Sequence, residues 1–585
     1  AKAGLDTFQT PFATLHLTTK GIRENSCNQC QTNNTPKVPL PTVGKPQGDN
    51  SKNSVTKSNP IRLTLCATFC SLHSLYTNTS KNEQMTLPNT KIFPFLFLLM
   101  ALPMAAQTIS SKLVDAKTQK GIPYATIQYG EHKGVITNDE GRFSFMLEGG
   151  IAPDSIYISS MGYEKKGFAL TQLQDSLVLL QPKAIALSGV YVFNEELEVD
   201  EIIEKMVERL PQNINKEPIK QRFFLRQSEF ATINKVDFGF KKSSIAELNK
   251  ELMDSLAQSI PKNGHHYTES LGDLYKNNGK YKLDIIKAAD LYDKNQVGSF
   301  EELGERMQTI FTENIKPDSY LKIKSGIFSQ KVQVDSILSD MEEEQAEQAE
   351  EVKKNLDKKK NTGLVDSQRH AFTELLTELY YNEDSKLDLI SKTRRYDFSL
   401  VGYAEIADAG VYVIDFEPKR SSADFKGRLY INIADFALMR LDVQNTDRLR
   451  NFRLLGITYR EVLYKGTMRF AQLPNGKYDL RFMDFTFGRY FAVDRPLKVV
   501  EKNKHVKGRR KQNELLLTID FRMSPTQKWE LVVFDQDLVS EDQFTNFTED
   551  KTARATYMPT YDPEFWQGHT IMEPNQAIRE FTVEE

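Results

Sequence analysis

The strongest structural signal in the sequence is a run of eight segments between residues 396 and 523 in which apolar and polar residues alternate. In one of them, Leu429 and other apolar residues alternate with Arg428 and other polar ones. A period of two places successive side chains on opposite faces of a β-strand, and tight-turn sequences at 408–410 and 474–476 separate neighbouring segments. The region therefore predicts a large antiparallel meander or half-barrel, whose apolar face must curl or be covered.

A second β-rich region, residues 107–193, has shorter strands, separated by turn sequences about every ten residues. Short strands at this spacing are typical of a β-sandwich. A chain of 585 residues predicts more than one domain, because single cores seldom grow beyond about 250–300 residues. We expect a sandwich at 107–193 and a separate antiparallel β domain at 396–585, in a mostly β chain with a helical insertion (α+β).

The sandwich region also carries a specific set of residues that serve turns, strand entries and the core. These are Asp115, Gly121-Ile122-Pro123-Tyr124-Ala125, Gly134, Thr137-Asn138-Asp139-Glu140-Gly141-Arg142-Phe143, Ser159-Ser160-Met161-Gly162-Tyr163 and the run from Leu177 to Leu180. With them the region resembles the carboxypeptidase-regulatory-like family, whose fold is a transthyretin-like β-sandwich. The resemblance implies a non-catalytic binding or structural module, found beside peptidases and in front of outer-membrane receptors, chiefly in Bacteroidetes-like bacteria.

Residues 194–395 are expected to hold a linker helix, a strand and a mostly helical region. A stripe of apolar residues between Val199 and Leu210 predicts an amphipathic helix that Pro211 ends, and residues 219–232 predict the strand. The helical region begins near residue 245.

Two further segments of the chain are marked by their composition. A block of glutamates followed by a block of lysines at 337–361 is typical of a solvated, charged insertion. Near the C-terminal end, residues 561–574 have the composition of a docking tail, in which we expect Trp566 to be packed.

A signal-peptide pattern occupies residues 85–106. Lys91 precedes an apolar run at 92–102 that is too short to span a bilayer, and small residues follow it. We expect translation to start at Met85, residues 1–84 to be untranslated upstream sequence or a disordered leader, and the mature chain to be exported to the periplasm or the outer membrane. No later apolar run reaches the roughly 18 residues that a transmembrane helix needs.

All four cysteines lie in the predicted leader: Cys27, Cys30, Cys66 and Cys70. Their paired spacing resembles that of zinc ligands, but we expect it to be incidental, because the segment lies outside the mature chain. The mature chain then contains no cysteine for a disulfide, a lipid anchor or a thiol nucleophile.

No catalytic or metal-binding set stands out in the mature chain. His266, Glu269 and His370 have the loose spacing of a zinc carboxypeptidase, but they lie in polar surroundings without the motifs that should accompany them. An acidic segment that begins at Asp293 fails as a calcium loop, because its twelfth position is Gly304 and not a glutamate. We therefore predict a protein that is not an enzyme and has no cofactor or metal.

The net charge of −3 argues against a nucleic-acid partner, since phosphate binding needs a concentrated basic surface. Two functions remain. The first is a structural or binding protein of the envelope whose sandwich docks on an unidentified protein, glycan or lipid. An outer-membrane transporter is set aside, because a barrel of that class needs about 22 strands and too few residues follow the sandwich.

The second function is a periplasmic carrier of a lipid, lipoprotein or other hydrophobic ligand. The segments Gly402-Tyr403-Ala404, Tyr412-Val413-Ile414-Asp415-Phe416 and Lys426-Gly427-Arg428-Leu429-Tyr430-Ile431 give the second β region a resemblance to the half-barrel of outer-membrane lipoprotein-sorting carriers. A clustered set of aromatics is the candidate lining of its site, with core packing as the alternative that the pattern favours: Phe482, Phe485, Phe487, Tyr490 and Phe491. An unfilled apolar concavity would favour this function, and one filled by the protein's own helix would weigh against it.

Overall fold

The computed structural model describes residues 107–130, 134–147, 155–173, 177–183, 197–334, 363–419, 423–507 and 510–583, all within one compact unit. The predicted leader with its four cysteines, the signal peptide, and the charged insertion at 337–361 lie outside the described residues. Within the described residues, no helix is long and apolar enough to cross a membrane.

The predicted sandwich region consists of short strands in two small sheets. One sheet has the order β4-β1-β7 and the other the order β3-β2-β5-β6. Alternate residues such as Phe143 and Phe145 are buried, as the period-two pattern requires. The resemblance to the carboxypeptidase-regulatory-like family stays a prediction. The strands are β1 (Gln107–Asp115), β2 (Thr126–Gln128), β3 (Gly134–Ile136), β4 (Arg142–Leu147), β5 (Ile156–Ser159), β6 (Lys166–Phe168) and β7 (Leu177–Leu180), with a short 3-10 helix η1 at Leu170–Gln172.

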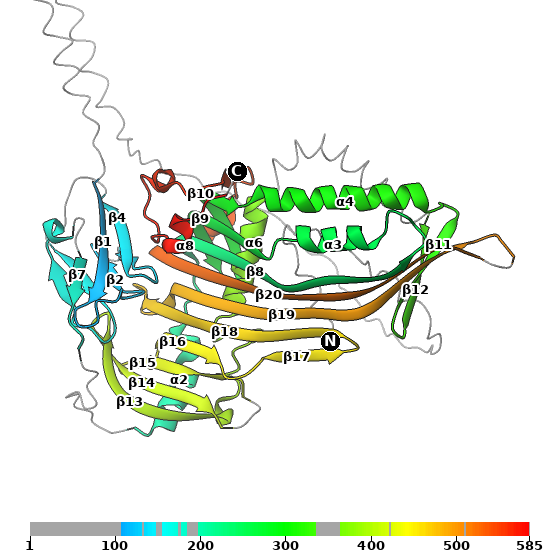
Figure 1. Ribbon diagram of the computed structural model, residues 1–585. Coiled ribbons are helices and arrows are strands. Elements are labelled where there is room, and N and C mark those ends of the chain that lie inside the picture. Colours follow the sequence, from blue (N-terminus) through cyan, green and yellow to red (C-terminus); the bar gives the residue numbers. More distant parts are fainter. Residues whose placement is uncertain are drawn as a thin grey trace, which may run out of the picture. The chain divides into compact units, whose positions relative to one another are not determined.

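The rest of the described chain is organised around one 14-stranded sheet (Figure 1). Its main path is β13-β14-β15-β16-β18-β19-β20-β8-β9-β10-β21, and β11, β12 and β17 pair beside it. Only β21 pairs in parallel, with β10. The strands are β8 (Ile219–Ser243), β9 (Asn263–Asn277), β10 (Lys280–Tyr292), β11 (Ser319–Ser325), β12 (Phe328–Gln333), β13 (Tyr396–Ile406), β14 (Ala409–Pro418), β15 (Phe425–Asn432), β16 (Leu438–Asn445), β17 (Arg450–Leu454), β18 (Ile457–Gln472), β19 (Tyr478–Asn503), β20 (Lys511–Leu538) and β21 (Thr556–Met558).

The prediction of an antiparallel meander after residue 396 is confirmed, in the strands β13 to β20. The segment 452–464, expected as one strand, instead turns at Leu455 and Gly456, and its second half continues through residue 472 as β18. The expectation of a mostly helical region at 245–395 is wrong, because β9 to β12 lie there and join the same sheet. The sheet therefore draws strands from both sides of the expected boundary at residue 396. Polar side chains buried on β9, such as Glu269 and Asp273, hide the alternation that would have marked it as a strand.

Three neighbouring strands, β19, β20 and β8, are unusually long, with 26, 28 and 25 residues. At about 3.3 Å per residue each spans roughly 80–90 Å, far more than one core can cover. We call the part of the sheet built on residues 478–487 of β19 the near half, and the part built on residues 488–503 the distal half. The pairing of β19 with β20 has one continuous register through residue 500, so odd-numbered residues of both strands stay on one face.

That face, the helix face, is covered at the near half by α2 (Val199–Asn213) and α6 (Leu364–Thr377). The predicted amphipathic helix is confirmed, with Ile202, Ile203 and Met206 buried. The prediction that Pro211 ends it is wrong, since α2 continues to Asn213. Proline removes only its own N–H bond, and Ile214 N–H still donates to Leu210 O.

At the far end of the sheet, α3 (Lys250–Ser259) and α4 (Lys294–Asn314) cover the helix face of the distal half. Figure 1 shows both helices alongside β8, with α4 reaching the region of β11. Their core is small and includes Leu252, Leu256, Ile310 and Leu517.

The opposite face of the near half, the tail face, packs on the sandwich and on the C-terminal segment. That segment holds α7 (Glu541–Asn546), the 3-10 helix η3 (Pro563–Trp566) and α8 (Gln576–Arg579). The predicted docking of Trp566 is confirmed, since its side chain is 3% exposed and lies against Phe224. Phe482 belongs to this same core, together with residues of the sandwich.

Candidate functional site

The five aromatic residues predicted to line one pocket do not share one surface. Phe485 and Phe487 lie in the core beneath α6, and Phe482 faces the sandwich, with its ring 5.0 Å from that of Tyr124. Tyr490 lies on the tail face beneath the guanidinium of Arg460. Phe491 alone is half-buried on the helix face outside the cores. Alternation explains the split, because the even-numbered and odd-numbered residues of β19 point to opposite faces.

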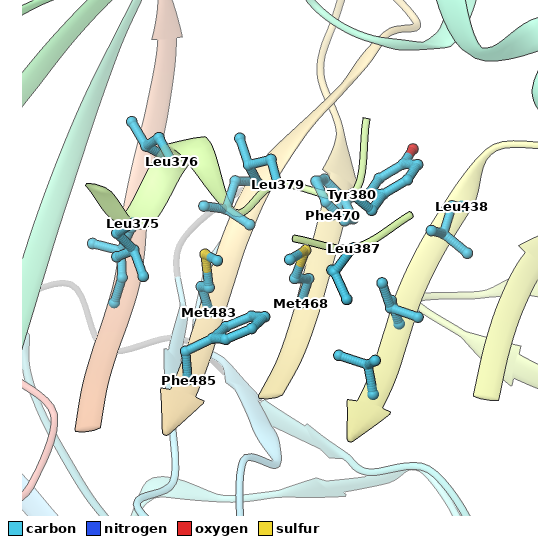
Figure 2. Close-up of a cluster of buried hydrophobic side chains, with 14 of the residues drawn as sticks. Leu375, Leu376, Leu379, Tyr380, Leu387, Leu438, Met468, Phe470, Met483 and Phe485 are labelled. Carbon is cyan, nitrogen blue, oxygen red and sulfur yellow. The ribbon is translucent and has the colours of Figure 1, made fainter. Parts of the chain in front are cut away.

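The concave space above the near half is filled by the chain itself. Figure 2 shows side chains from α6 and the segment after it lying directly over those of β16, β18 and β19. This outcome weighs against a ligand cavity in that half of the sheet. The side chains in contact are Leu375, Leu376, Leu379, Tyr380 and Leu387 above, with Leu438, Met468, Phe470, Met483 and Phe485 below.

On the distal half, a row of apolar side chains crosses five strands on the helix face. Residues that oppose each other across an antiparallel pair share a face, so the register fixes the members. Phe491 opposes Met523 and Tyr459, and Val493 opposes Phe521 and Ile457. We call this row the apolar band; its members are Ile233 and Val236 (β8), Met523 and Phe521 (β20), Phe491 and Val493 (β19), Tyr459 and Ile457 (β18), and Phe452 and Leu454 (β17).

The apolar band is poorly covered by the described part of the chain. Eight of its ten members are half-buried, and Phe452 and Leu454 are 50% and 52% exposed. None of the ten packs into the core beneath α6 or the core beneath α3 and α4, among the residues that the structure describes. A contiguous apolar surface of this kind marks a binding site more often than an accident of packing.

A belt of polar side chains separates the apolar band from the filled near half. Arg489 Nη1 donates to Gln527 Oε1 at 3.1 Å, and Gln527 Nε2 donates to Glu229 Oε1 at 3.2 Å. Beside them, Tyr459 donates its hydroxyl to Glu461 at 3.2 Å, and Lys386 lies 3.6 Å from the same carboxylate. The helix face of the distal half is therefore amphipathic, with hydrogen-bonding groups along one edge of an apolar surface.

Arg495 marks the other side of the apolar band, where two hairpin tips meet β19. Its guanidinium lies over the ring of Phe328 at 4.9 Å and donates to Ser325 O, while its stem packs against Gly456. The side chain is 8% exposed, and its Nε–H has no hydrogen-bond partner in the described chain. No feature of the sequence distinguished this arginine from the others on the same strands.

The residues weighed as zinc ligands are held apart by other partners. Both carboxylate oxygens of Glu269 are occupied, Oε1 by Arg226 and Oε2 by Trp566 Nε1, and His370 lies exposed on α6. His266 lies 2.6 Å from Asp290; burial acts to lower the pKa of His266, but the hydrogen bond and charge of Asp290 outweigh it and raise that pKa. Among the described residues, no group of three or more histidine or carboxylate side chains could hold a metal ion.

The segment weighed as a calcium loop also has another role. The carboxylate of Asp293 accepts a hydrogen bond from Asn295 N–H at 2.8 Å and caps the first turn of α4. The acidic side chain that prompted the comparison is therefore a helix cap.

No family model matches the sequence, and no curated protein matches it. Solved structures give low similarity. A domain described as belonging to outer membrane lipoprotein sorting, from Vibrio parahaemolyticus, has 9% identity and a TM-score of 0.18, over 59% of this chain and 97% of that one. A LolA superfamily protein from Nitrosomonas europaea has 10% identity and a TM-score of 0.16, over 60% and 99%. MucB in its complex with MucA from Pseudomonas aeruginosa has 8% identity and a TM-score of 0.17, over 56% and 92%. Similarity this low leaves the function to be argued from the geometry.

Proposed function

We propose that this chain is an exported envelope protein that binds a lipid-like amphiphile and carries it, with the acyl chain lying across the apolar band. The observation that supports this function is the band itself, a half-buried apolar surface between two filled cores. The proposal revises the carrier hypothesis in one respect. The ligand lies on the distal half of the sheet, because α6 fills the half where an unfilled concavity was sought.

The dimensions of the band suit an acyl chain. Its five strands, about 4.8 Å apart, span roughly 19 Å. One leaflet contributes about 15 Å to the hydrocarbon core of a bilayer, so the band can accommodate most of one lipid tail. Burying a tail on it would remove apolar surface from water on both partners, which is the main favourable term in such binding.

The polar belt supplies a place for the other end of the ligand. Arg489, Gln527 and Tyr459 present hydrogen-bonding groups along the edge of the band. A ligand with a polar group at one end of an apolar chain would match both features, whereas a wholly apolar ligand would leave the belt unused. The expectations that the chain is exported, and that it is not an enzyme, are part of this proposal.

The first prediction concerns the protein as isolated. Native mass spectrometry of residues 107–585, purified gently from the envelope fraction of a bacterial host, is expected to show a bound mass of lipid size. Organic extraction is expected to remove that mass, because the contact is apolar. A clean polypeptide mass that also fails to take up added fatty acid would contradict the proposal and favour docking of the sandwich on protein partners.

The second prediction compares two neighbouring residues on opposite faces of β19. Phe491→Gln is expected to weaken the binding of a fluorescent fatty acid about tenfold, since a buried aromatic contributes about 1.5–3 kcal/mol and this one is partly exposed. Tyr490→Gln, on the tail face, is the matched control and is expected to bind like the parent. Equal affinities for all three proteins, with unchanged circular dichroism, would place the ligand elsewhere.

A further inference from the structure

The two hairpin tips beside the apolar band carry exposed apolar side chains. The β11–β12 hairpin turns through Gly326 and Ile327, and the β17–β18 hairpin turns through Leu455 and Gly456. Ile327 is 80% exposed, which is an unfavourable position for so large an apolar side chain. We call the exposed apolar set the rim; it consists of Ile327 and Phe328 on one tip and Phe452, Leu454 and Leu455 on the other.

Arg495 and its neighbour hold the two tips together. Arg495 contacts Ser325 and Phe328 of the first tip, and its stem packs against Gly456 of the second. In addition, Asp494 N–H donates to Gly456 O at 2.7 Å. The rim is therefore one surface formed by two hairpins, and Leu454 and Phe452 make it continuous with the apolar band.

The rim is flanked by four lysines, three of which have no carboxylate partner in the described chain. Lys322 directly opposes Lys331, and Lys324 opposes Lys498, across neighbouring strands. Like charges in these positions destabilise a sheet, so their placement has a cost for the fold. Only Lys498 of these four has a carboxylate partner among the described residues, Glu514 at 2.7 Å.

The local charge contrasts with that of the whole chain. Residues 316–333 carry four lysines and one aspartate, and residues 450–461 carry three arginines and one glutamate, Glu461, which pairs with Arg450 at 3.6 Å, while the chain has a net charge of −3. Asp494 is the exposed acid that adjoins the tips. By the strand register, Lys322, Lys324, Lys331 and Arg453 lie on the tail face of the two tips, and Phe328, Phe452 and Leu454 lie on the helix face. Exposed apolar side chains at a tip that also carries lysine and arginine are the combination that binds an anionic membrane surface, with the apolar groups entering the headgroup region.

We propose that the rim docks on an anionic lipid bilayer, with Ile327 and Phe328 inserted and Lys322, Lys324, Lys331 and Arg453 over the headgroups. A nucleic acid would satisfy the cations but offers no apolar interior for the rim, so the bilayer is the occupant that matches both features. This inference goes beyond amphiphile binding and does not depend on it, since a vesicle can be bound with the apolar band empty.

The test uses the chain with vesicles of phosphatidylcholine alone, or of phosphatidylcholine and phosphatidylglycerol at a ratio of about 7:3, in a flotation assay. The parent is expected to bind the anionic vesicles at least about tenfold more tightly, and to lose most of that preference in about 0.5 M salt. Ile327→Ser with Phe328→Ser is expected to lower binding about tenfold. The triple change Lys322→Gln, Lys324→Gln and Lys331→Gln is expected to remove most of the lipid preference.

Leu177→Ser with Leu179→Ser is the matched control, because these residues are also exposed, at 63% and 45%, but lie on β7 of the sandwich. A second readout comes from Ile327→Trp, whose fluorescence is expected to shift to the blue on anionic vesicles while the buried Trp529 and Trp566 do not change. The inference would be overturned if the rim variants floated like the parent, or if the sandwich control lost as much binding as the rim variants. It would also be overturned if double-stranded DNA displaced the vesicles and the fluorescence of the new tryptophan did not shift.

Discussion

Replacing Arg226 by methionine is expected to lower the free energy of unfolding by about 3–5 kcal/mol. Arg226 and Glu269 are both fully buried, with Arg226 Nε donating to Glu269 Oε1 at 2.6 Å. The guanidinium also donates to the carbonyl of Met572 at 2.8 Å and lies 3.8 Å from Glu530. Methionine fills a similar volume but leaves Glu269 charged and uncompensated in the core, and that uncompensated charge is the source of the loss.

Urea unfolding measures this loss, and Arg222→Met is its matched control. Arg222 lies four residues earlier on the same strand and pairs with Asp273 at 2.5 Å, but its side chain is 40% exposed. Lys220 also pairs with Asp273, at 3.0 Å, so that carboxylate keeps a partner, and a loss of about 1 kcal/mol or less is expected. If the two variants lost equal free energy of unfolding, burial of the ion pair would not be what determines its contribution to stability.

The same substitution is expected to release the C-terminal segment. Arg226 binds the carbonyls of Met572 and Glu573, and Trp566 Nε1 donates to Glu269 at 3.0 Å, so the pair joins β8 and β9 to the tail. Limited proteolysis of Arg226→Met should therefore cut after residue 560 before it cuts the sheet. A tail as resistant as that of the parent would mean that its apolar contacts alone hold it.

The sequence predicts those parts of the fold that are determined locally. The strands after residue 396 alternate along their own length, and their hairpin turns lie at positions such as Gly476, whose φ of +78° glycine adopts without strain. Strand β9 lacks this signal, because Glu269, Ser270 and Asp273 are buried and polar. Their partners come from β8, α6 and the tail, at sequence separations that no local pattern reveals.

In the candidate site, too, the locally determined features could be predicted from the sequence and those set by tertiary packing could not. Alternation places Phe491 and Val493 on one face, and this much can be obtained from the sequence. Which part of a 26-residue strand is left uncovered depends on where α6 and α3 pack, and that is a tertiary property. Arg495 could not be recognised either, because its role depends on two hairpin tips from segments that lie about 40 and 170 residues earlier.

The contact between the sheet and the sandwich is expected to depend on pH through Asp484. Tyr124 of the sandwich donates its hydroxyl to Asp484 at 2.5 Å, and Arg469 donates to the carbonyl of Tyr124. Burial raises the pKa of Asp484 to about 6; the charge of Lys528 opposes this rise, and that of Glu530 adds to it. The protonated form of Asp484 is therefore favoured in the folded protein more than in the unfolded chain.

The raised pKa of Asp484 determines how the stability of the protein changes with pH. Because the folded pKa is raised, proton binding at Asp484 contributes its full stability below about pH 4, and this contribution is lost as the pH rises through about 6. The difference between the ordinary pKa of 3.8 and the folded pKa of about 6 corresponds to up to about 3 kcal/mol of folding stability. Asp484→Asn keeps an acceptor for the Tyr124 hydroxyl without the charge, so this variant is expected to exceed the parent in stability by about 2–3 kcal/mol at pH 8 and to match it near pH 4.

Urea midpoints at pH 4, 5, 6 and 8 measure this difference, which must grow from pH 4, be about half complete near pH 5, between the unfolded and folded pKa values of Asp484, and level off above pH 6. Asp415→Asn is the control, since Asp415 is a half-buried carboxylate paired with Arg428, and its difference from the parent should stay within about 1 kcal/mol at each pH. Parallel curves for the parent and Asp484→Asn would mean that the carboxylate keeps its charge when the sandwich is docked. In that case the sheet and the sandwich would stay in contact regardless of pH, held by the apolar packing around Phe482 and by the hydrogen bond from Arg469 to the carbonyl of Tyr124.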